Sequence, residues 1–168
     1  LFLFQARVEA QSHRLTVEDE PTVEYMAKFI AGIQQRYTQT GGRRPFGISS
    51  LVAGVDSDGT PRLFTTDPAG VCAAWKANAV GRHSSSLREL LEREYKADMD
   101  EDDAVKLSIR TLLEVVESGA KTIEVVVFKK DPPSASLPEA KIAEIVATIE
   151  AEAEESEEAA GGGGAGSG

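Results

Sequence analysis

The chain has 168 residues, of which 41% are hydrophobic and 27% are charged, and a formal net charge of −10. This length is enough for one domain with a buried core, and the composition is ordinary for a soluble globular protein. The single cysteine, Cys72, excludes an internal disulfide and fits a reducing compartment. No apolar run approaches the ~20 residues of a membrane-spanning helix, and the acidic balance disfavours nucleic acid.

Two helices are predicted first. Residues 5–16 have weak periodicity and read as the end of a helix. The next helix is clearer, because four apolar positions recur at spacings of four, three and four residues: Met26, Ile30, Ile33 and Tyr37. Its start is predicted in residues 19–22, with Asp19 as the cap candidate, and its end at the glycine pair 41–42.

Three strands follow in the prediction. Residues 46–55, 62–66 and 71–80 are rich in strand-forming residues, and turn sequences separate them at 56–59 and 67–70. Short strands joined by tight turns predict an antiparallel meander.

Helices resume at Ser86, which forms a capping-box pattern with Glu89. Acidic residues 100–103 predict the start of the next helix, because carboxylates favour the positive end of the helix dipole. Gly119 is expected to end that helix. Its buried face is predicted to carry four apolar residues, namely Val105, Ile109, Leu112 and Val116.

The C-terminal part is predicted to contain a strand, a break and a helix. Residues 122–128 read as a strand buried on both faces, and residues 131–133 break the chain. A final helix opens at Pro138 with an apolar stripe of Ile142, Ile145, Ile149 and Ala153. Its far end is strongly acidic, since residues 139–158 hold eight glutamates and one lysine, a net charge of −7. Helices before and after a block of strands predict the α+β class.

The sequence contains fragments of three catalytic or metal-binding motifs, but each lacks a residue or an arrangement that its chemistry requires. An N-terminal threonine nucleophile uses its own amine as base, whereas the threonines here read as internal strand residues. His13 and His83 lie beside serines, but sequence neighbours rarely make a catalytic triad. An acidic run resembles the start of a calcium loop but lacks the glycine and glutamate that the loop requires later. We therefore predict no catalytic residue, no cofactor and no metal site.

Four blocks carry a resemblance: residues 6–19 (ARVEAQSHRLTVED), 42–49 (GRRPFGIS), 66–70 (TDPAG) and 75–82 (WKANAVGR). In this order and spacing they resemble α-type subunits of the proteasome, above all the type-7 branch of that family. The resemblance runs from about residue 6 to residue 130. Family members carry more residues before the first block, so the chain is expected to be truncated at its N-terminus.

The resemblance implies an N-terminal-nucleophile-hydrolase-like αββα sandwich, incomplete because the first strands and the gate segment are missing. It implies a non-catalytic structural subunit of the proteasome core α ring that supports ubiquitin-dependent protein degradation without a cofactor. The expected partners are the other α subunits of a heteroheptameric ring and the β subunits, in the cytoplasm and nucleus. With strands missing, unpaired sheet edges predict that the isolated chain is poorly stable.

Residues for subunit contact also come from the resemblance. Ring-to-ring contact is expected at one matched block of the first helix, with residues Arg7, Glu9, Gln11, Ser12, His13 and Arg14. Arg43 and Arg44 are expected either in a solvated turn or in an intersubunit pair. The expected division of the chain is a partial proteasome core at 1–130, an acidic helix at 131–158 and a disordered glycine-rich tail at 159–168.

Two alternative functions stay open at this point. One is an active threonine hydrolase of the same fold, which would carry a free threonine at a processed N-terminus. The other is an independent interaction module that binds a basic partner through the acidic helix. Deletion of residues 139–168 separates these alternatives, because a ring subunit should still enter large particles.

Overall fold

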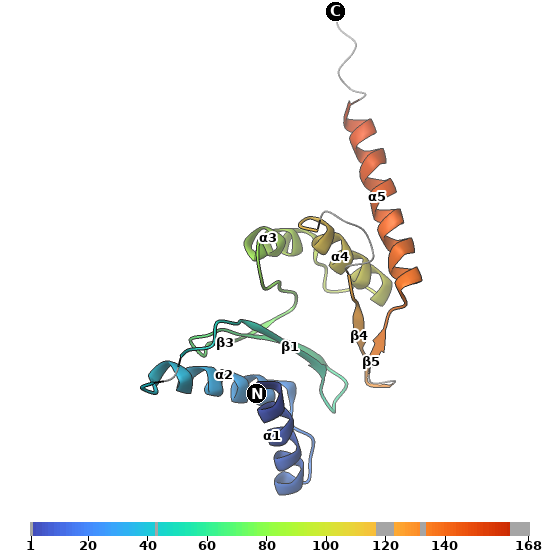
Figure 1. Cartoon of the computed structure of the whole chain (residues 1–168). Helices are drawn as coiled ribbons and strands as arrows, with labels where there is room; N and C mark the ends of the chain where they lie inside the picture. Colours follow the sequence, from blue (N-terminus) through green and yellow to red (C-terminus); the bar gives the residue numbers. More distant parts are fainter. Residues whose placement is uncertain (1, 43, 117–122, 132–133, 162–168) are drawn as a thin grey trace, which may run out of the picture. The chain divides into compact units, whose positions relative to one another are not determined.

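The structure is a computed structural model that describes residues 2–42, 44–116, 123–131 and 134–161 (Figure 1). Helices and strands both occur, in the order α1, α2, β1, β2, β3, α3, α4, β4, β5, α5, which confirms the α+β class. The chain divides into two compact units, which are described separately: a first unit of residues 1–88 with 128–135, and a second unit of residues 89–127 with 136–168. None of the helices in the described ranges is long and apolar enough to cross a membrane.

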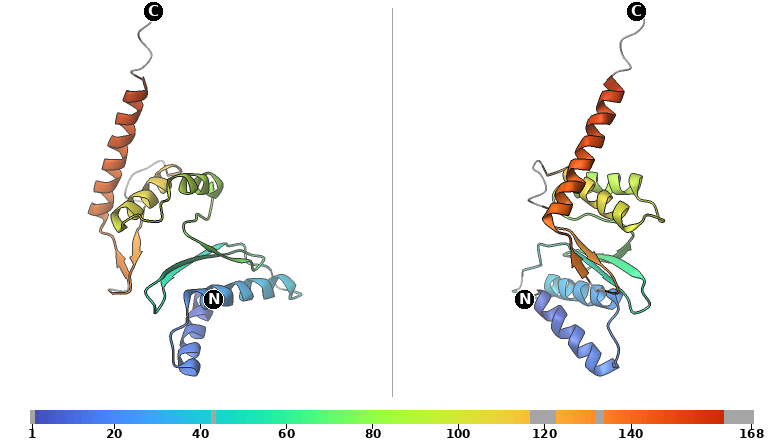
Figure 2. Two further views of the ribbon diagram at one scale, coloured as in Figure 1. Left: turned by 180° about the vertical axis from the view of Figure 1, so that it is seen from behind. Right: turned by 90° about the vertical axis from the view of Figure 1, so that its right-hand side faces the viewer.

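The first unit begins with α1 (Phe2–Val17) and α2 (Val23–Gln39), which meet at a steep angle (Figure 2). The helical stripe predicted for α2 is confirmed, since all four of its members are buried or half-buried. The predicted cap is wrong: Thr22, not Asp19, accepts a hydrogen bond from the Tyr25 amide, at 3.1 Å. A threonine directly before the first helical residue satisfies one of the amides that lack a partner within the helix.

The predicted antiparallel meander is confirmed. β1 (Ser50–Val55), β2 (Pro61–Thr66) and β3 (Cys72–Trp75) form one sheet in that order. The turn before β2 is closed by the Gly59 amide, which donates to the Asp56 carbonyl at 2.8 Å. The turn before β3 closes in the same way at residues 67–70.

The two outer strands are shorter than predicted. Residues 46–49 do not join the sheet, because the fully buried Gln34 of α2 donates its side-chain amide to the Ile48 carbonyl at 3.1 Å. After Trp75 the chain leaves the sheet and passes through Gly81, whose φ of 117° is a conformation that favours glycine. A hydrogen bond from α2 and a change of chain direction at Gly81 therefore replace part of the expected ladder.

One face of the sheet packs against α2 (Figures 1 and 2). Alternation along the strands turns Phe64 and Thr66 toward the helix, and both are buried. The opposite face carries Leu51, Leu63 and Trp75, which the register places on neighbouring strands. Within the first unit this second face is only partly covered, because Trp75 is 42% exposed and Leu51 equally so.

The second unit is built around α4 (Glu101–Leu113) and α5 (Glu139–Gly161). Buried residues from both helices and from the segment before β4 form its core: Val105, Ile109, Ile123, Ile142, Val146 and Ile149. The predicted start of α4 in residues 100–103 is confirmed, and Asp100 caps the helix, because its side chain accepts from the Asp103 amide at 2.8 Å. The apolar stripe of α5 is confirmed only up to Ile149, since Ala153 is exposed.

Two helix predictions are wrong in detail. α3 (Ser84–Glu94) begins before the predicted capping box, and Ser86 donates its hydroxyl to the His83 carbonyl at 2.9 Å instead of accepting from an amide. In α4 the predicted buried stripe fails after Ile109, because Leu112 is exposed and the helix ends before Val116. Gly119 lies outside the described residues.

The predicted strand at 122–128 is also wrong in part. β4 (Val126–Phe128) has only three residues and pairs with β5 (Ser134–Ser136), which the sequence did not indicate. Val126 and Phe128 are about half exposed, at 48% and 51%, so β4 is not buried on both faces. Thr122, the prolines of the predicted break and residues 162–168 lie outside the described residues, so the division of the chain at residues 130 and 158 stays a prediction.

Candidate interaction surface

α1 has two distinct faces. Ala6 is buried against α2, and Glu9, Ala10 and His13 on the same face are half-buried, as expected for positions three and four residues apart. The opposite face is exposed. We call it the outward face of α1, and it consists of Phe4, Arg7, Val8, Gln11, Arg14 and Leu15.

The structure separates the residues predicted for subunit contact into two sets. Arg7, Gln11 and Arg14 lie on the outward face, and Ser12 is exposed beside it. Glu9 and His13 instead face α2, where the Tyr25 hydroxyl donates to Glu9 Oε1 at 2.6 Å. Arg44 is exposed on the segment before β1, and Arg43 lies outside the described residues. Contact with another subunit stays a prediction for all of them.

Apolar residues on the outward face were missed by the sequence prediction. Leu15 is 85% exposed and Phe4 is 67% exposed, which is unusual for large apolar side chains on a helix that also packs inside the protein. Their spacing with Val8 was a signal that could have been found, because residues 4, 8, 11 and 15 share one side of a helix. A shallow cavity of about 220 Å³ lies beside this face, lined in part by Phe4, Val8 and Phe29.

The charges of the outward face are positive. Arg7 and Arg14 are its two ionisable residues, and Arg14 also pairs with Glu20 at 3.3 Å, with both side chains more than half exposed. An exposed pair of this kind adds little stability, so it leaves Arg14 available at small cost. The face therefore combines apolar contact area with arginines, a composition enriched at protein interfaces.

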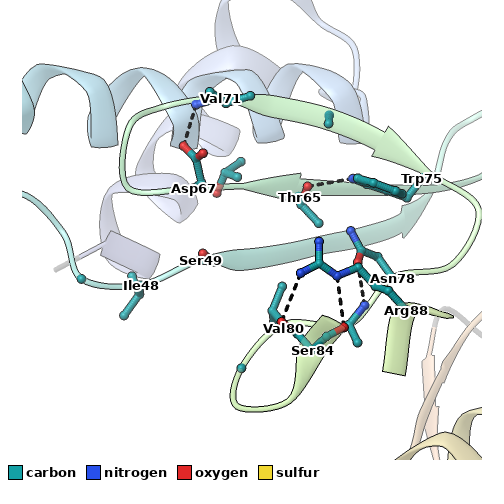
Figure 3. A pocket seen from close by; sticks show the side chains of 15 residues that line it. Ile48, Ser49, Thr65, Asp67, Val71, Trp75, Asn78, Val80, Ser84 and Arg88 are labelled. Atoms are coloured by element: carbon teal, nitrogen blue, oxygen red, sulfur yellow. Dashed lines mark hydrogen bonds between the residues drawn. The ribbon is translucent and has the colours of Figure 1, made fainter. Parts of the chain in front are cut away.

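A larger cavity lies on the face of the sheet opposite α2 (Figure 3). Its volume is about 680 Å³, and it is lined by residues of β2 and β3, of the segment before β1, of the chain between β3 and α3, and of α3 itself. The indole of Trp75 donates to Thr65 Oγ1 at 2.9 Å, and Arg88 donates to the Ser84 carbonyl and hydroxyl at 3.1 and 3.2 Å. These bonds hold the lining residues to one another.

Few side chains that line this cavity can carry a charge. Its ionisable lining residues, within the described part of the chain, are Asp67 and Arg88. Asp67 accepts from the Val71 amide at 2.9 Å, which is a turn contact, and an arginine is a poor general base because it stays protonated.

Other reactive groups are isolated in the described ranges. Burial raises the pKa of the Cys72 thiol, which makes it a weaker nucleophile. No group of three or more His, Cys, Asp or Glu side chains in these ranges is placed to hold a metal ion. His83 meets Ser86 through its backbone carbonyl and not through its ring.

Comparison with known proteins confirms the resemblance. The sequence model of the family described as "Proteasome subunit" matches residues 2–128. The chain is 54% identical to "Proteasome subunit alpha type-7" of Dictyostelium discoideum, over 92% of this chain and 61% of that protein. It is 58% identical to the protein of the same name from Cicer arietinum, over 88% of this chain and 59% of that protein. A "Proteasome subunit alpha type-8" of Mus musculus is 53% identical, over 88% of this chain and 60% of that protein.

Proposed function

Because the chain belongs to the proteasome subunit family, we propose that it is a non-catalytic structural subunit of the α ring of the proteasome core particle. The observation that carries this proposal is the sequence identity with relatives that are named as α-type subunits. It exceeds 50% over about nine-tenths of the chain. The chain spans about 60% of the length of these relatives. A role in ubiquitin-dependent protein degradation, the activity of the whole particle, is therefore also a proposal for this chain.

The partly covered sheet supports the finer fold assignment that we propose, an incomplete αββα sandwich. In the first unit, α2 covers one face of a three-stranded sheet and the other face presents Leu51, Leu63 and Trp75. In a sandwich, a second sheet packs about 10 Å away against such an apolar face. We propose that a second sheet of this kind covers the face that carries Leu51, Leu63 and Trp75.

The proposed partners are the other α subunits and the β subunits. The outward face of α1 supports contact with a neighbouring subunit, because arginines and large apolar residues are exposed together there. Arg44 and Arg43 are proposed as further contact residues. We propose that the chain is located in the cytoplasm and the nucleus.

Size fractionation of a native extract tests the proposal. The full chain, tagged and produced in cells that make proteasomes, should migrate with the assembled particle. Deletion of residues 139–168 would also remove Ile142, Val146 and Ile149 from the core of the second unit. The matched variant is therefore one that neutralises three exposed glutamates of α5, Glu139→Gln, Glu144→Gln and Glu150→Gln, and it should still enter the particle. Migration of the full chain as a small soluble species would contradict the proposal. Entry that is lost when these glutamates are neutralised would favour an acidic interaction module, and labelling by a probe for catalytic hydroxyls would favour a threonine hydrolase.

A further inference from the structure

The junction of α1 and α2 depends on few side chains. Among the α1 residues whose exposure the structure describes, Ala6 alone is buried, so the apolar contact between the helices is small. Tyr25, in the first turn of α2, contacts two α1 residues at once. Its hydroxyl donates to Glu9 Oε1 at 2.6 Å, and its ring lies 4.5 Å from the ring of His13, tilted by 53°.

These two contacts restrain the orientation of α1. Glu9 and His13 are four residues apart, so they lie one above the other on a single side of the helix. Rotation of α1 by even one residue position, about 100°, would carry both away from Tyr25. The same rotation would move Arg7, Val8 and Arg14 away from their present direction. The contacts of Tyr25 and the direction of the outward face are therefore geometrically linked.

The chemistry of the contact suits an orienting role. A hydroxyl that donates to a carboxylate makes a charge-assisted hydrogen bond, which is shorter and stronger than a neutral one. Tilted aromatic rings at this separation attract each other through their quadrupoles. Both interactions are directional, whereas the contact of Ala6 with α2 is not. The contacts of Tyr25 therefore fix the orientation of α1 against α2 more than they add binding energy between the two helices.

We propose that Tyr25 is a positioning residue for docking through α1: it holds Glu9 and His13 and thereby points the outward face at the neighbouring subunit. This inference rests on the proposed function, since it assumes that the outward face contacts another subunit. Tyr25 itself need not touch that subunit. Its effect passes through α1.

Tyr25→Phe tests the inference, because it removes the hydroxyl and keeps the ring. Tyr95→Phe is the matched control, since Tyr95 is equally exposed at 37% and lies in the second unit. Tagged full chains carrying either change are produced in cells that make proteasomes, and the fraction in the particle is measured. Tyr25→Phe should lower that fraction by about twofold to tenfold, the range expected for the loss of one ordinary hydrogen bond at an exposed position, and Tyr95→Phe should leave it unchanged.

A second variant separates orientation from general stability. In a chain with Arg7→Glu and Arg14→Glu the outward face no longer fits, so Tyr25→Phe should cause no further loss of assembly. A merely structural role would make Tyr25→Phe lower the fraction by the same factor in both backgrounds. Equal assembly of the Tyr25→Phe and Tyr95→Phe chains would also overturn the inference. If the unmodified chain fails to enter the particle, the proposed function is what fails.

Discussion

Asp56 shows how one side chain joins distant parts of the first unit. Its Oδ1 accepts from the Val23 amide at 2.8 Å, and its Oδ2 accepts from Arg62 Nε at 3.3 Å. The first amides of a helix have no partner within the helix, so the carboxylate at the end of β1 completes the start of α2. It also adds negative charge near the positive end of the helix dipole.

Replacement of Asp56 should therefore loosen the start of α2. Asp56→Ala leaves the part-buried Val23 amide without its acceptor, which costs about 1–3 kcal/mol. Hydrogen exchange of amides in the first turn of α2 should then become roughly fivefold to hundredfold faster. Asp56→Asn keeps an acceptor oxygen and should show a smaller effect. The exposed Asp98→Ala is the control, and equal exchange in the Asp56→Ala and Asp98→Ala chains would contradict this assignment.

The hydrogen bond between Tyr25 and Glu9 should depend on pH in a specific way. The hydrogen bond to Glu9 raises the pKa of the Tyr25 hydroxyl above its ordinary value of 10.0. Because the pKa in the folded chain is the higher one, the contribution of this contact is complete below about pH 10 and is lost as pH rises through the folded pKa. Tyrosinate absorbance, taken as the difference between the unmodified and Tyr25→Phe chains, should titrate above pH 10. Glu9→Gln should shift that titration downward, and a midpoint at or below 10 would refute the contact.

Among the elements, the turn between β2 and β3 shows how closely the sheet approaches α2. Gly70 has a φ of 88°, and a Cβ built on it would lie 2.6 Å from Gln35 Cβ and 2.8 Å from the Ala31 carbonyl oxygen. Gly42 has a similar φ of 80°, with no atom within 4 Å of the corresponding position. Both glycines avoid backbone strain, but only Gly70 is also required by packing.

Alanine substitutions at these two glycines should therefore differ. Each adds about 1–2 kcal/mol of strain from the left-handed conformation. Gly70→Ala adds the cost of moving α2 away from the turn, typically a further 1–3 kcal/mol for overpacking. Amides of β2 and β3 should exchange faster in the Gly70→Ala chain than in the Gly42→Ala chain. Similar exchange rates in the two variant chains would mean that the turn at Gly70 is not closely packed against α2.

At the scale of the whole molecule, the sheet of the first unit has an apolar face that this unit does not fully cover. Trp75 and Leu51 are each 42% exposed there, and β1 and β3 are edge strands. Exposed apolar area and unpaired edges favour association over a stable monomer. We expect the isolated chain to bind a hydrophobic dye such as ANS and to lack a sharp melt at high temperature. A cooperative, high-temperature transition of the monomer without dye binding would contradict this expectation.

The sequence by itself determined the local elements of this protein. Periodicity and turn residues located α2, β2 and the start of α4, because spacing along a helix or strand is a local property. Four sequence blocks were enough to reveal the family. They also led to the prediction that α1 contacts another subunit, but they did not distinguish Arg7 and Arg14 from Glu9 and His13, since all belong to one block.

Only the tertiary structure decided which side of each helix or strand packs inside the protein and which side is exposed. Glu9 and His13 turn inward because Tyr25, twelve to sixteen residues later in the chain, supplies a hydroxyl and a ring to meet them. Asp56 caps a helix that begins 33 residues earlier, and Gln34 takes the Ile48 carbonyl from the expected strand. Such pairings depend on which segments meet after folding. Local spacing therefore predicted where helices and strands occur, while contacts between them decided which residues remain free to bind a partner.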